Sequence, residues 1–291
     1  MATGSSLILV ILFTLLAGIT IGKFWERYKL RGGRWFDRRR AKQSPHYILG
    51  LNFMVSNQPD LAIEELNKAI SLDTEAIEIH MILGNLYREK GQVGRAIHMH
   101  QKLLQRPNLS TIEHAYVLLC LGLDFKRGGF LDRALETFDE VLRLDSNNRY
   151  ALLNLEKLYE EQHQWELAHN AREKAMAFDK NDSHENMPIL AFLKNELGLV
   201  AQQQQNSVEA KHYFETAIEL SEQTIPAYLH LGDAQVISGD VAGAAETWER
   251  LIDVAPDRAY LVFDRLSEIY SQLGSLNKFQ TLCQNLINAN K

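Results

Sequence analysis

The stretch GNLYREKG at residues 84–91, with Ala96 a few residues further on, decides the fold of this chain. Gly84 has no Cβ, so a second helix can approach it closely. Tyr87 lies one helical turn later and can fill the space between the two helices. Gly91 suits the left-handed conformation that ends many helices. Ala96 suits the point where the second helix crosses nearest to the first, and the stretch therefore predicts a helix-turn-helix unit.

The same pattern recurs along the chain in one register, which can be followed through the position of Gly84, here called the glycine slot. Tetratricopeptide repeats have a period of about 34 residues, and half of the steps between successive slots match it while the others are longer. The sequence therefore predicts an all-α tetratricopeptide repeat superhelix of about seven helix-turn-helix units. The slots hold Gly50, Gly84, Gly122, Glu156, Gly198, Gly232 and Ser267.

Composition and cysteine content agree with a folded repeat protein. The 291 residues are 46% apolar and 23% charged, with a formal net charge of −6, which is typical of folded rather than disordered chains. A repeat array accounts for the length without a second core, because each unit packs only on its neighbours. Cys120 and Cys283 fall in different repeats, which favours free thiols in a reducing compartment. No Cys-x-x-Cys pair occurs, which excludes a zinc ribbon or rubredoxin-like knuckle within this sequence.

An uncharged apolar run, residues 7–22, lies near the amino terminus, and Ser5 and Ser6 can extend it. Its length is at the short end of the range for a transmembrane helix. A cleaved signal peptide is the alternative, but no basic residue precedes the run and no cleavage site with a neutral mature end follows it. We therefore predict an amino-terminal tail over residues 1–4 and an uncleaved transmembrane helix over residues 5–25.

A basic juxtamembrane segment, residues 26–43, separates this helix from the repeats at residues 44–291. Nine basic and two acidic residues between positions 23 and 42 give this flank a net charge of +7. Positively charged flanks remain in the cytoplasm, so the amino terminus is expected outside and the repeats inside the cell. Interleaved aromatic residues suit the headgroup level, and the cations suit anionic lipid. The residues expected at the membrane surface are Arg27, Lys29, Arg31, Arg34, Arg38, Arg39 and Arg40.

The repeats carry no recognisable catalytic or cofactor motif. The sequence has no Gly-x-Ser-x-Gly, no phosphate-binding loop, no His-Glu-x-x-His and no dinucleotide fingerprint, so we expect neither an enzyme nor a cofactor. The histidines near residue 100 do not predict a metal site, because His98 and His100 point about 200° apart on a helix. His80 and His100 occupy packing positions of the repeat and are expected to be buried. The acidic repeats, with a net charge of −13 over residues 43–291, also disfavour nucleic acid as a ligand.

The first helix of each unit is expected to line the inner face of the superhelix and to bind a partner there. An apolar lining with interspersed Asn, Arg and Lys suits an extended or helical peptide. We expect Asn85 to bind a peptide amide and Arg88 to face the groove and pair with a partner carboxylate. The alternative is that single residues of this set merely support neighbouring helices. The candidate groove residues are Tyr47, Leu51, Met54, Met81, Asn85, Arg88, Leu119, Leu123, Lys126 and Lys157.

Several runs in the first half of the sequence are more specific than the repeat pattern requires. They are Tyr47–Phe53, Ser56–Asp60, Leu83–Arg88, Arg95–Ile97, His100–Gln101, Leu121–Gly122, Asp124–Phe125 and Asp132–Ala134, with single matches at Ala62, His80, Gly91 and Gly129. In these runs the chain resembles the lipopolysaccharide assembly protein B family of bacterial inner-membrane tetratricopeptide proteins. The close match covers about residues 1–140. The resemblance implies an adaptor that presents the deacetylase of lipid A synthesis to a membrane AAA+ protease.

The family also carries a carboxy-terminal rubredoxin-like metal domain with paired Cys-x-x-Cys, and because this sequence has no such pair we expect the chain to lack that domain. Three interpretations stay open: the domain was lost, it is encoded elsewhere, or the chain is only a relative of the family. The expected protein is a single-pass adaptor of the bacterial inner membrane, with cytoplasmic repeats that bind protein or peptide partners. Those partners include a membrane AAA+ protease and a lipid A synthesis enzyme, but no nucleic acid and no small-molecule substrate. The alternative function is a general tetratricopeptide scaffold for the assembly of envelope or secretion machinery.

Overall fold

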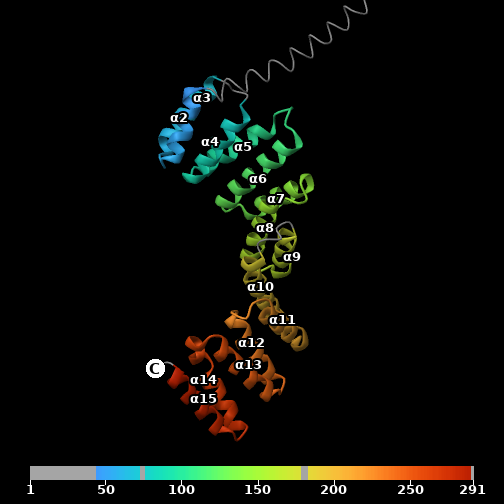
Figure 1. Cartoon of the computed structure of the whole chain (residues 1–291). Helices are drawn as coiled ribbons and strands as arrows, with labels where there is room; N and C mark the ends of the chain where they lie inside the picture. Colours follow the sequence, from blue (N-terminus) through green and yellow to red (C-terminus); the bar gives the residue numbers. More distant parts are fainter. Residues whose placement is uncertain (1–43, 73–75, 178–182, 290–291) are drawn as a thin grey trace, which may run out of the picture. The chain divides into compact units, whose positions relative to one another are not determined.

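The computed structural model describes residues 44–72, 76–177 and 183–289. Every secondary-structure element in these ranges is a helix (Figure 1). The chain divides into two compact units, one ending at Leu144 and the other beginning at Asp145. The predicted tail, the transmembrane helix over residues 5–25 and the basic segment over residues 26–43 lie outside the described residues.

The first unit contains three helix pairs. Its helices are α2 (Pro45–Val55), α3 (Pro59–Leu72), α4 (Ile77–Glu89), α5 (Val93–Leu104), α6 (Thr111–Arg127) and α7 (Leu131–Leu144). Each first helix packs most extensively on the second helix of its own pair, as α2 does on α3 and α6 on α7. The second helix of one pair also packs on the first helix of the next, and α4 in addition contacts α6. This order of contacts is the nearest-neighbour stacking of a repeat protein.

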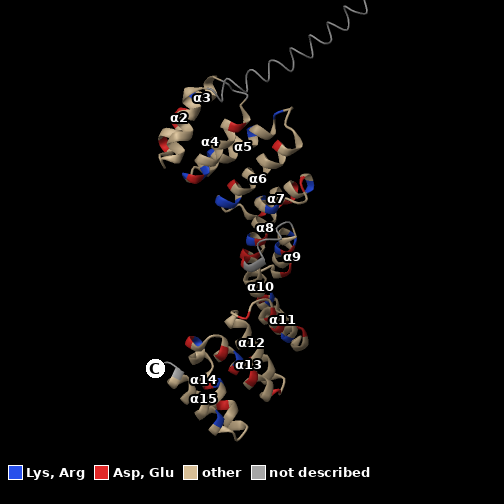
Figure 2. Cartoon of the chain, viewed as in Figure 1, with Lys and Arg blue, Asp and Glu red and all other residues tan. Residues whose placement is uncertain are grey.

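The second unit contains four further pairs and one short 3₁₀ helix. Its helices are α8 (Arg149–Glu161), α9 (Trp165–Met176), α10 (Ser183–Gln203), α11 (Ser207–Leu220), α12 (Ile225–Ile237), α13 (Val241–Val254), η1 (Pro256–Leu261), α14 (Phe263–Gln272) and α15 (Leu276–Ala289). The described residues thus contain the predicted seven pairs, and the all-α tetratricopeptide fold is confirmed. The second unit is the more acidic one: residues 145–291 contain 22 Asp and Glu against 12 Lys and Arg (Figure 2).

Close contact at the glycine slot explains the register. In every pair with a glycine at this slot, the residue 16 positions later belongs to the second helix and lies over the slot. A Cβ on Gly122 would lie 2.6 Å from the ring of Phe138, closer than side-chain atoms approach one another. Phe138 itself is fully buried, so the ring has little room to move away. The residues in this second position, here called the cover slot, are Leu66, His100, Phe138, Arg172, Phe214, Trp248 and Cys283.

The turn inside each pair also repeats. The residue seven positions after the glycine slot has a positive φ in every pair, from 54° at Asn57 to 83° at Gly239. Glycine adopts this left-handed conformation at little cost, and four of the seven turns use it. The other three turns use Asn57, His163 and Gln205. The repeat therefore specifies the backbone conformation more strictly than it specifies the residue.

Candidate functional site

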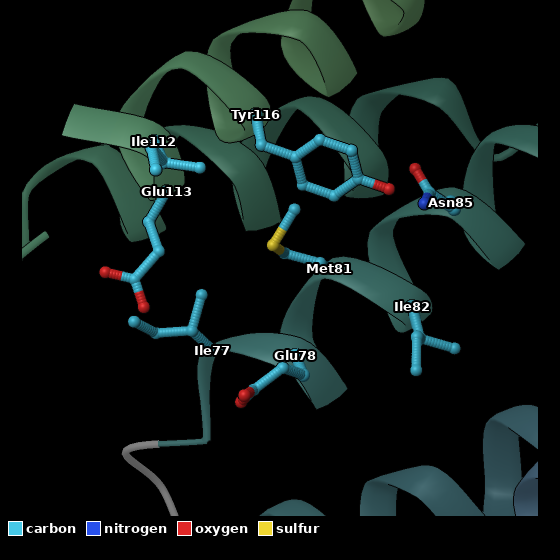
Figure 3. A pocket seen from close by; sticks show the side chains of 8 residues that line it. All are labelled: Ile77, Glu78, Met81, Ile82, Asn85, Ile112, Glu113 and Tyr116. Atoms are coloured by element: carbon cyan, nitrogen blue, oxygen red, sulfur yellow. The ribbon is translucent and has the colours of Figure 1, made fainter. Parts of the chain in front are cut away.

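A pocket of about 350 Å³ lies between α4 and α6 in the first unit (Figure 3). Both helices are the first helix of their pair, so the pocket belongs to the face on which a partner was expected. Its lining combines apolar side chains with two carboxylates, one amide and one phenol. The lining residues are Ile77, Glu78, Met81, Ile82 and Asn85 from α4, and Ile112, Glu113 and Tyr116 from α6.

Helical spacing aligns the two walls. Ile77, Met81 and Asn85 follow one another at intervals of about one turn along α4 and lie on one face of the helix. Ile112 and Tyr116 are related in the same way on α6. Met81 is buried, whereas Ile112 is 82% and Tyr116 is 52% exposed. Met81 therefore contributes to the inner surface of the pocket, and the two α6 side chains remain accessible to a ligand.

The amino-terminal end of α6 is held by a capping box. The Glu113 N–H donates to Ser110 Oγ over 3.3 Å, and the Ser110 N–H donates to Glu113 Oε2 over 2.9 Å. These bonds satisfy two backbone donors at the start of the helix. They also fix the first turn of α6, which carries Ile112 and Glu113. One wall of the pocket is therefore built on an ordered helix end.

The two walls are joined beyond Asn85 by an ion pair between the half-buried Arg88 and the buried Asp124. Arg88 Nη1 donates to Asp124 Oδ1 over 2.8 Å and to the Cys120 carbonyl oxygen over 3.3 Å. Asp124 is fully buried, and its second oxygen, Oδ2, lies 2.5 Å from His100 Nδ1. One carboxylate thus links α4, α5 and α6. Because removing a partner from such a group leaves a buried charge, the link is costly to break.

This geometry corrects the expectation that Arg88 faces the groove. The Arg88 side chain is only 17% exposed, and its guanidinium pairs with Asp124 on the neighbouring helix rather than pointing into open space. The cause is a carboxylate in the next repeat, which the single-repeat pattern does not reveal. The structure therefore places Arg88 among the contacts that hold α4 against α6.

Asn85 lies between the ion pair and the apolar part of the pocket. Its side chain contacts the Cys120 thiol, and its Oδ1 atom is buried without a hydrogen-bond partner among the described residues. Burial raises the pKa of the Cys120 thiol to about 11, so this cysteine stays protonated and unreactive at neutral pH. An unpaired buried amide oxygen is costly. Asn85 is thus the polar group of this pocket most in need of a partner.

The remaining candidate groove residues are distributed over other helices. Tyr47 and Leu51 are half-buried on α2, Met54 is exposed near its end, and Leu119 is buried on α6. Leu123 and Lys126 are half-buried on α6. Lys157, in the second unit, bonds to Glu160 Oε2 over 2.9 Å. Of the predicted groove residues, the pocket brings together Met81 and Asn85, both from α4.

Sequence reasoning missed the α6 wall. Helix α6 begins at Thr111 and α4 begins at Ile77, so α6 starts a full turn further ahead of its glycine slot than α4 does. The additional turn carries Ile112 and Glu113, which a fixed set of offsets from the slot does not reach. The pattern Ser110-x-x-Glu113 is a helix-start signal and could have located this turn. Ile82 on α4 was missed because only three offsets per helix were considered.

The histidines near residue 100 act in packing. His80 is buried and its Nδ1 lies 2.8 Å from the Ala76 carbonyl oxygen, while His100 lies over Gly84. Among the described residues, no three His, Cys, Asp or Glu side chains are grouped so that they could hold a metal ion.

The second unit uses polar pairs in the same way along its first helices. Arg265 on α14 donates to Asp233 on α12 through Nε over 2.9 Å and through Nη2 over 3.0 Å. His230 Nδ1, also on α12, lies 2.8 Å from Asn195 Oδ1 on α10. Burial lowers the pKa of the His230 imidazole, which favours its neutral form. Polar side chains on this face therefore connect consecutive repeats to one another.

Helices long and apolar enough to cross a bilayer do not occur within the described ranges. The transmembrane helix predicted at residues 5–25 lies outside those ranges and stays a prediction.

Comparisons with known proteins agree with this fold. A tetratricopeptide repeat family model matches residues 195–261. Lipopolysaccharide assembly protein B of Escherichia coli K12 is 26% identical over 267 residues, which cover 89% of this chain and 68% of that protein. The Haemophilus influenzae protein of the same name is 27% identical over 266 residues, which cover 85% of this chain and 66% of that one.

One solved structure shares the fold of this chain at low sequence identity, and the likeness therefore concerns the fold only. The carboxy-terminal part of a tetratricopeptide repeat-containing protein from Cytophaga hutchinsonii aligns with a TM-score of 0.53 at 17% identity, over 83% of this chain and 94% of that one. Repeat arrays of this kind present extended concave surfaces on which other molecules can bind. The resemblance noted in the sequence is confirmed: the chain is a tetratricopeptide repeat protein related to lipopolysaccharide assembly protein B.

Proposed function

We propose that this protein is an adaptor of the bacterial inner membrane, anchored by residues 5–25, that binds proteins through its cytoplasmic repeats and regulates lipopolysaccharide synthesis or assembly. The observation that carries the proposal is the pocket between α4 and α6 in a chain related over 89% of its length to lipopolysaccharide assembly protein B. Pockets that combine apolar walls with a few polar groups are the usual form of a binding site.

The pocket suits a peptide segment of a partner. An apolar side chain of the partner would pack against Met81 and the Tyr116 ring, which border the same space (Figure 3). Asn85 lines the same space, and its side-chain amide would supply the polar contact to the peptide backbone. The ion pair of Arg88 with Asp124 keeps the two walls together without the ligand. Such preorganisation lowers the cost of binding.

The partners we propose are a membrane AAA+ protease and an enzyme of lipid A synthesis, which the adaptor would bring together at the membrane. The acidic charge of the repeats supports protein rather than nucleic acid partners, because a phosphate backbone is repelled by such a surface. The second candidate is a general scaffold for envelope or secretion machinery. This second function would use the same fold and the same pocket, and it differs from the first only in which proteins are bound.

Site-specific photo-crosslinking in living cells separates these two functions. A photoreactive residue replaces Ile112, which is 82% exposed at the pocket, in the full-length chain. The matched control replaces Tyr150, which is 71% exposed on α8 in the second unit. We expect crosslinks from position 112 to a membrane protease or a lipid A enzyme and none to them from position 150.

The outcomes are distinct. Crosslinks from position 112 to unrelated envelope proteins would establish the general scaffold instead. An absence of any crosslink at position 112, with the protein present at normal levels, would remove the pocket from the proposed function. Lipopolysaccharide measured after depletion of the protein gives an independent readout, and an unchanged amount would contradict a regulatory role.

A further inference from the structure

We propose that α2 lies in the headgroup region of the bilayer, with one face against lipid, so that the first unit is held to the membrane at a second point. This face, here called the outer face of α2, consists of Pro45, Ile48, Leu49, Asn52 and Val55. The inference rests on the proposed function, because it requires the anchor over residues 5–25. It goes beyond that anchor by assigning a lipid contact to the folded repeats.

The outer face of α2 is apolar and exposed. Its residues are three or four positions apart, so they share one side of the helix, opposite to Gly50. Val55 is 90% exposed, and Ile48 and Leu49 are exposed as well. The helix contains no Asp, Glu, Lys or Arg, whereas each other first helix of a described pair has at least one carboxylate. A helix that is apolar all round is usually buried, in protein or in a membrane.

The equivalent face is covered in the next repeat. Leu49 and Asn52 correspond to Leu83 and Leu86 of α4, which lie 34 positions later. Both leucines are buried in one hydrophobic cluster with residues of α3, the second helix of the preceding pair. The structure describes no helix pair before α2. Among the described residues, the outer face of α2 is therefore a packing surface without a protein partner.

Contacts with α3 fix the direction of the outer face. A Cβ on Gly50 would lie 2.7 Å from Leu66 Cγ, so the two helices are in close contact at the glycine slot. His46 Nδ1 lies 2.6 Å from Glu65 Oε2. Because these contacts are made by the other side of α2, its exposed apolar residues stay on the surface of the unit.

The charges beside α2 are compatible with an anionic membrane surface. Helix α3 has three carboxylates, and each is close to a basic group. Glu64 and Glu65 accept from Lys68 Nζ over 2.9 and 2.7 Å. Asp60 is paired with Lys90 of α4. These pairs reduce the repulsion between the first helix pair and anionic lipid.

The position of α2 in the chain favours lipid as the occupant of its outer face. The residues between the predicted anchor and the described repeats, 26–43, form the basic segment that suits anionic headgroups. Even when fully extended, a segment of this length spans at most about 60 Å. A tether to the bilayer keeps the effective concentration of the face at the lipid surface high, so a weak apolar contact is sufficient.

A lipid contact of α2 would determine how the first unit is oriented on the membrane. The pocket between α4 and α6 belongs to the same compact unit, in which α4 packs on α3. The pocket would then be held at a fixed height above the bilayer. A partner segment close to the membrane could reach it there, and the proposed membrane protease would present such a segment.

The test uses the full-length chain in nanodiscs of phosphatidylethanolamine and phosphatidylglycerol, with one chain in each disc. Cys283 is replaced by serine throughout, and Cys120 is kept because it is buried. An environment-sensitive fluorophore is attached to Val55→Cys or, as the matched control, to Val208→Cys, since Val208 is 82% exposed on α11. Quenching is measured with lipids that carry a nitroxide high in the acyl chain, and separately with iodide in the water.

We expect lipid nitroxides to quench the label at position 55 at least about twofold more than the label at position 208, because interfacial helices lie about 5 to 10 Å deep. Iodide should give the reverse order. The double variant Ile48→Gln, Leu49→Gln should remove the difference, with an unchanged circular dichroism spectrum because both side chains are exposed. Ile112→Gln, at an exposed position of α6, is its control and should leave the difference intact.

Other results would overturn the proposal. Equal lipid quenching at positions 55 and 208 would remove the specific contact of α2. Protection of position 55 from iodide without lipid quenching would assign the outer face to segment 26–43 of the same chain. Protection that appears only in discs with two chains would assign the face to a second copy.

Failure of this inference can be told apart from failure of the proposed function. If the chain does not enter bilayers, the anchor over residues 5–25 is rejected, and the α2 contact with it. If the chain enters bilayers and position 112 crosslinks to the proposed partners, an absence of lipid quenching at position 55 rejects the α2 contact alone.

Discussion

The helix pairs α4/α5 and α8/α9 differ in the residues that meet where their two helices are in closest contact. In α4/α5 the glycine slot is Gly84 and the cover slot is His100, which lies directly over it. In α8/α9 the same two positions hold Glu156 and Arg172, and Arg172 Nε donates to Glu156 Oε1 over 3.2 Å. All three of these ionisable side chains are buried. A tetratricopeptide unit thus tolerates a charged pair where it usually has a glycine and an aromatic ring.

The difference lies in where the partner of each buried charge comes from. His100 is paired with Asp124 of the next helix pair, and Asp124 also holds Arg88 on the face with the pocket. Arg172 is paired with Glu156 of its own helix pair. Its Nη1 also donates to Asn186 Oδ1 of the next helix pair over 3.2 Å. The α4/α5 network therefore connects the helix core to the candidate site, whereas the α8/α9 pair serves mainly its own two helices. Four predictions test this contrast.

The largest effect is expected from Asp124→Leu. The change leaves Arg88 and His100 without their shared acceptor in a buried place, and such losses cost about 3 to 5 kcal/mol. The free energy of unfolding is measured by urea titration followed by circular dichroism. Glu140→Gln, at an exposed position on α7, is the control and should lie within about 0.5 kcal/mol of the parent protein. A loss below about 1 kcal/mol at Asp124 would show that the network is not a major source of stability.

The next effect concerns the crossing point of the two helices. Ala96 in α5 and Ala168 in α9 occupy equivalent positions and are both fully buried. Leucine at either position should overpack the pair and cost about 1 to 3 kcal/mol. Urea unfolding of the two variants compares the two pairs directly. Gly94→Ala is the control in α5, because a Cβ there meets nothing within 4 Å. An Ala96→Leu variant with unchanged stability would contradict the register.

The third prediction is that the stability of the protein depends on pH through Glu156 in the α8/α9 pair. Burial raises the pKa of the Glu156 carboxyl, chiefly through loss of water, although Arg172 acts in the opposite direction. A raised pKa means that the folded protein keeps its proton longer than the unfolded chain does. The contribution of Glu156 is therefore fully present below about pH 4.5, the ordinary pKa of a glutamate, and is lost as the pH rises through the higher folded value.

Comparison with Glu156→Gln isolates this contribution. The stability of the parent protein relative to this variant should fall as the pH rises above about 4.5, by at most about 1.4 kcal/mol per pH unit for one proton. The free energy of unfolding is measured at a series of pH values. A difference that is constant, or that grows in favour of the parent protein with rising pH, would show that pairing with Arg172 outweighs burial.

The contrast between the two pairs also shows how far the sequence alone reaches. The glycine-slot register predicts both helix pairs, α4/α5 and α8/α9, because it reflects a close contact between the two helices of one pair. In the structure this contact is between Gly84 and His100 in the first pair and between Glu156 and Arg172 in the second. It does not predict that Arg88 binds Asp124, since that contact is between two units and depends on how α4 packs on α6. A polar residue on the inner face can thus serve a ligand or the next repeat, and only the packing decides.

The candidate site was predicted in part for the same reason. Met81 and Asn85 follow from offsets inside one repeat and are found in the pocket. Ile112 lies on an additional turn at the start of α6, which the average repeat does not have. Residues specific to one repeat are those that a repeat pattern averages out. The local helix-start signal at Ser110 and Glu113 is the kind of information that recovers them.

The smallest effect is expected at the turns of the two pairs, which differ although their backbones match. Gly91 joins α4 to α5 with φ of 73°, and His163 joins α8 to α9 with φ of 56°. Nothing lies within 4 Å of a Cβ at Gly91, so Gly91→Ala should cost only the left-handed strain of an L-residue, about 1 kcal/mol. His163→Gly removes the same strain, but it also removes the edge-on contact of the imidazole with the Trp165 ring, whose centroid is 5.3 Å away. Because such a contact offsets much of the gain, His163→Gly should stabilise the protein by no more than about 0.5 kcal/mol.

Asparagine at position 163 separates the two contributions, since it tolerates the left-handed region but cannot make the aromatic contact. The expected result is that His163→Asn is less stable than the parent protein while His163→Gly has the same stability as the parent protein. This result would show that the contact between the His163 and Trp165 rings stabilises the turn of α8/α9, whereas the turn of α4/α5 depends on the backbone conformation of glycine alone. A gain of more than about 1 kcal/mol for His163→Gly would mean instead that the imidazole contributes nothing and that the second pair keeps a strained turn. Thermal and urea unfolding of the three variants decide between these outcomes.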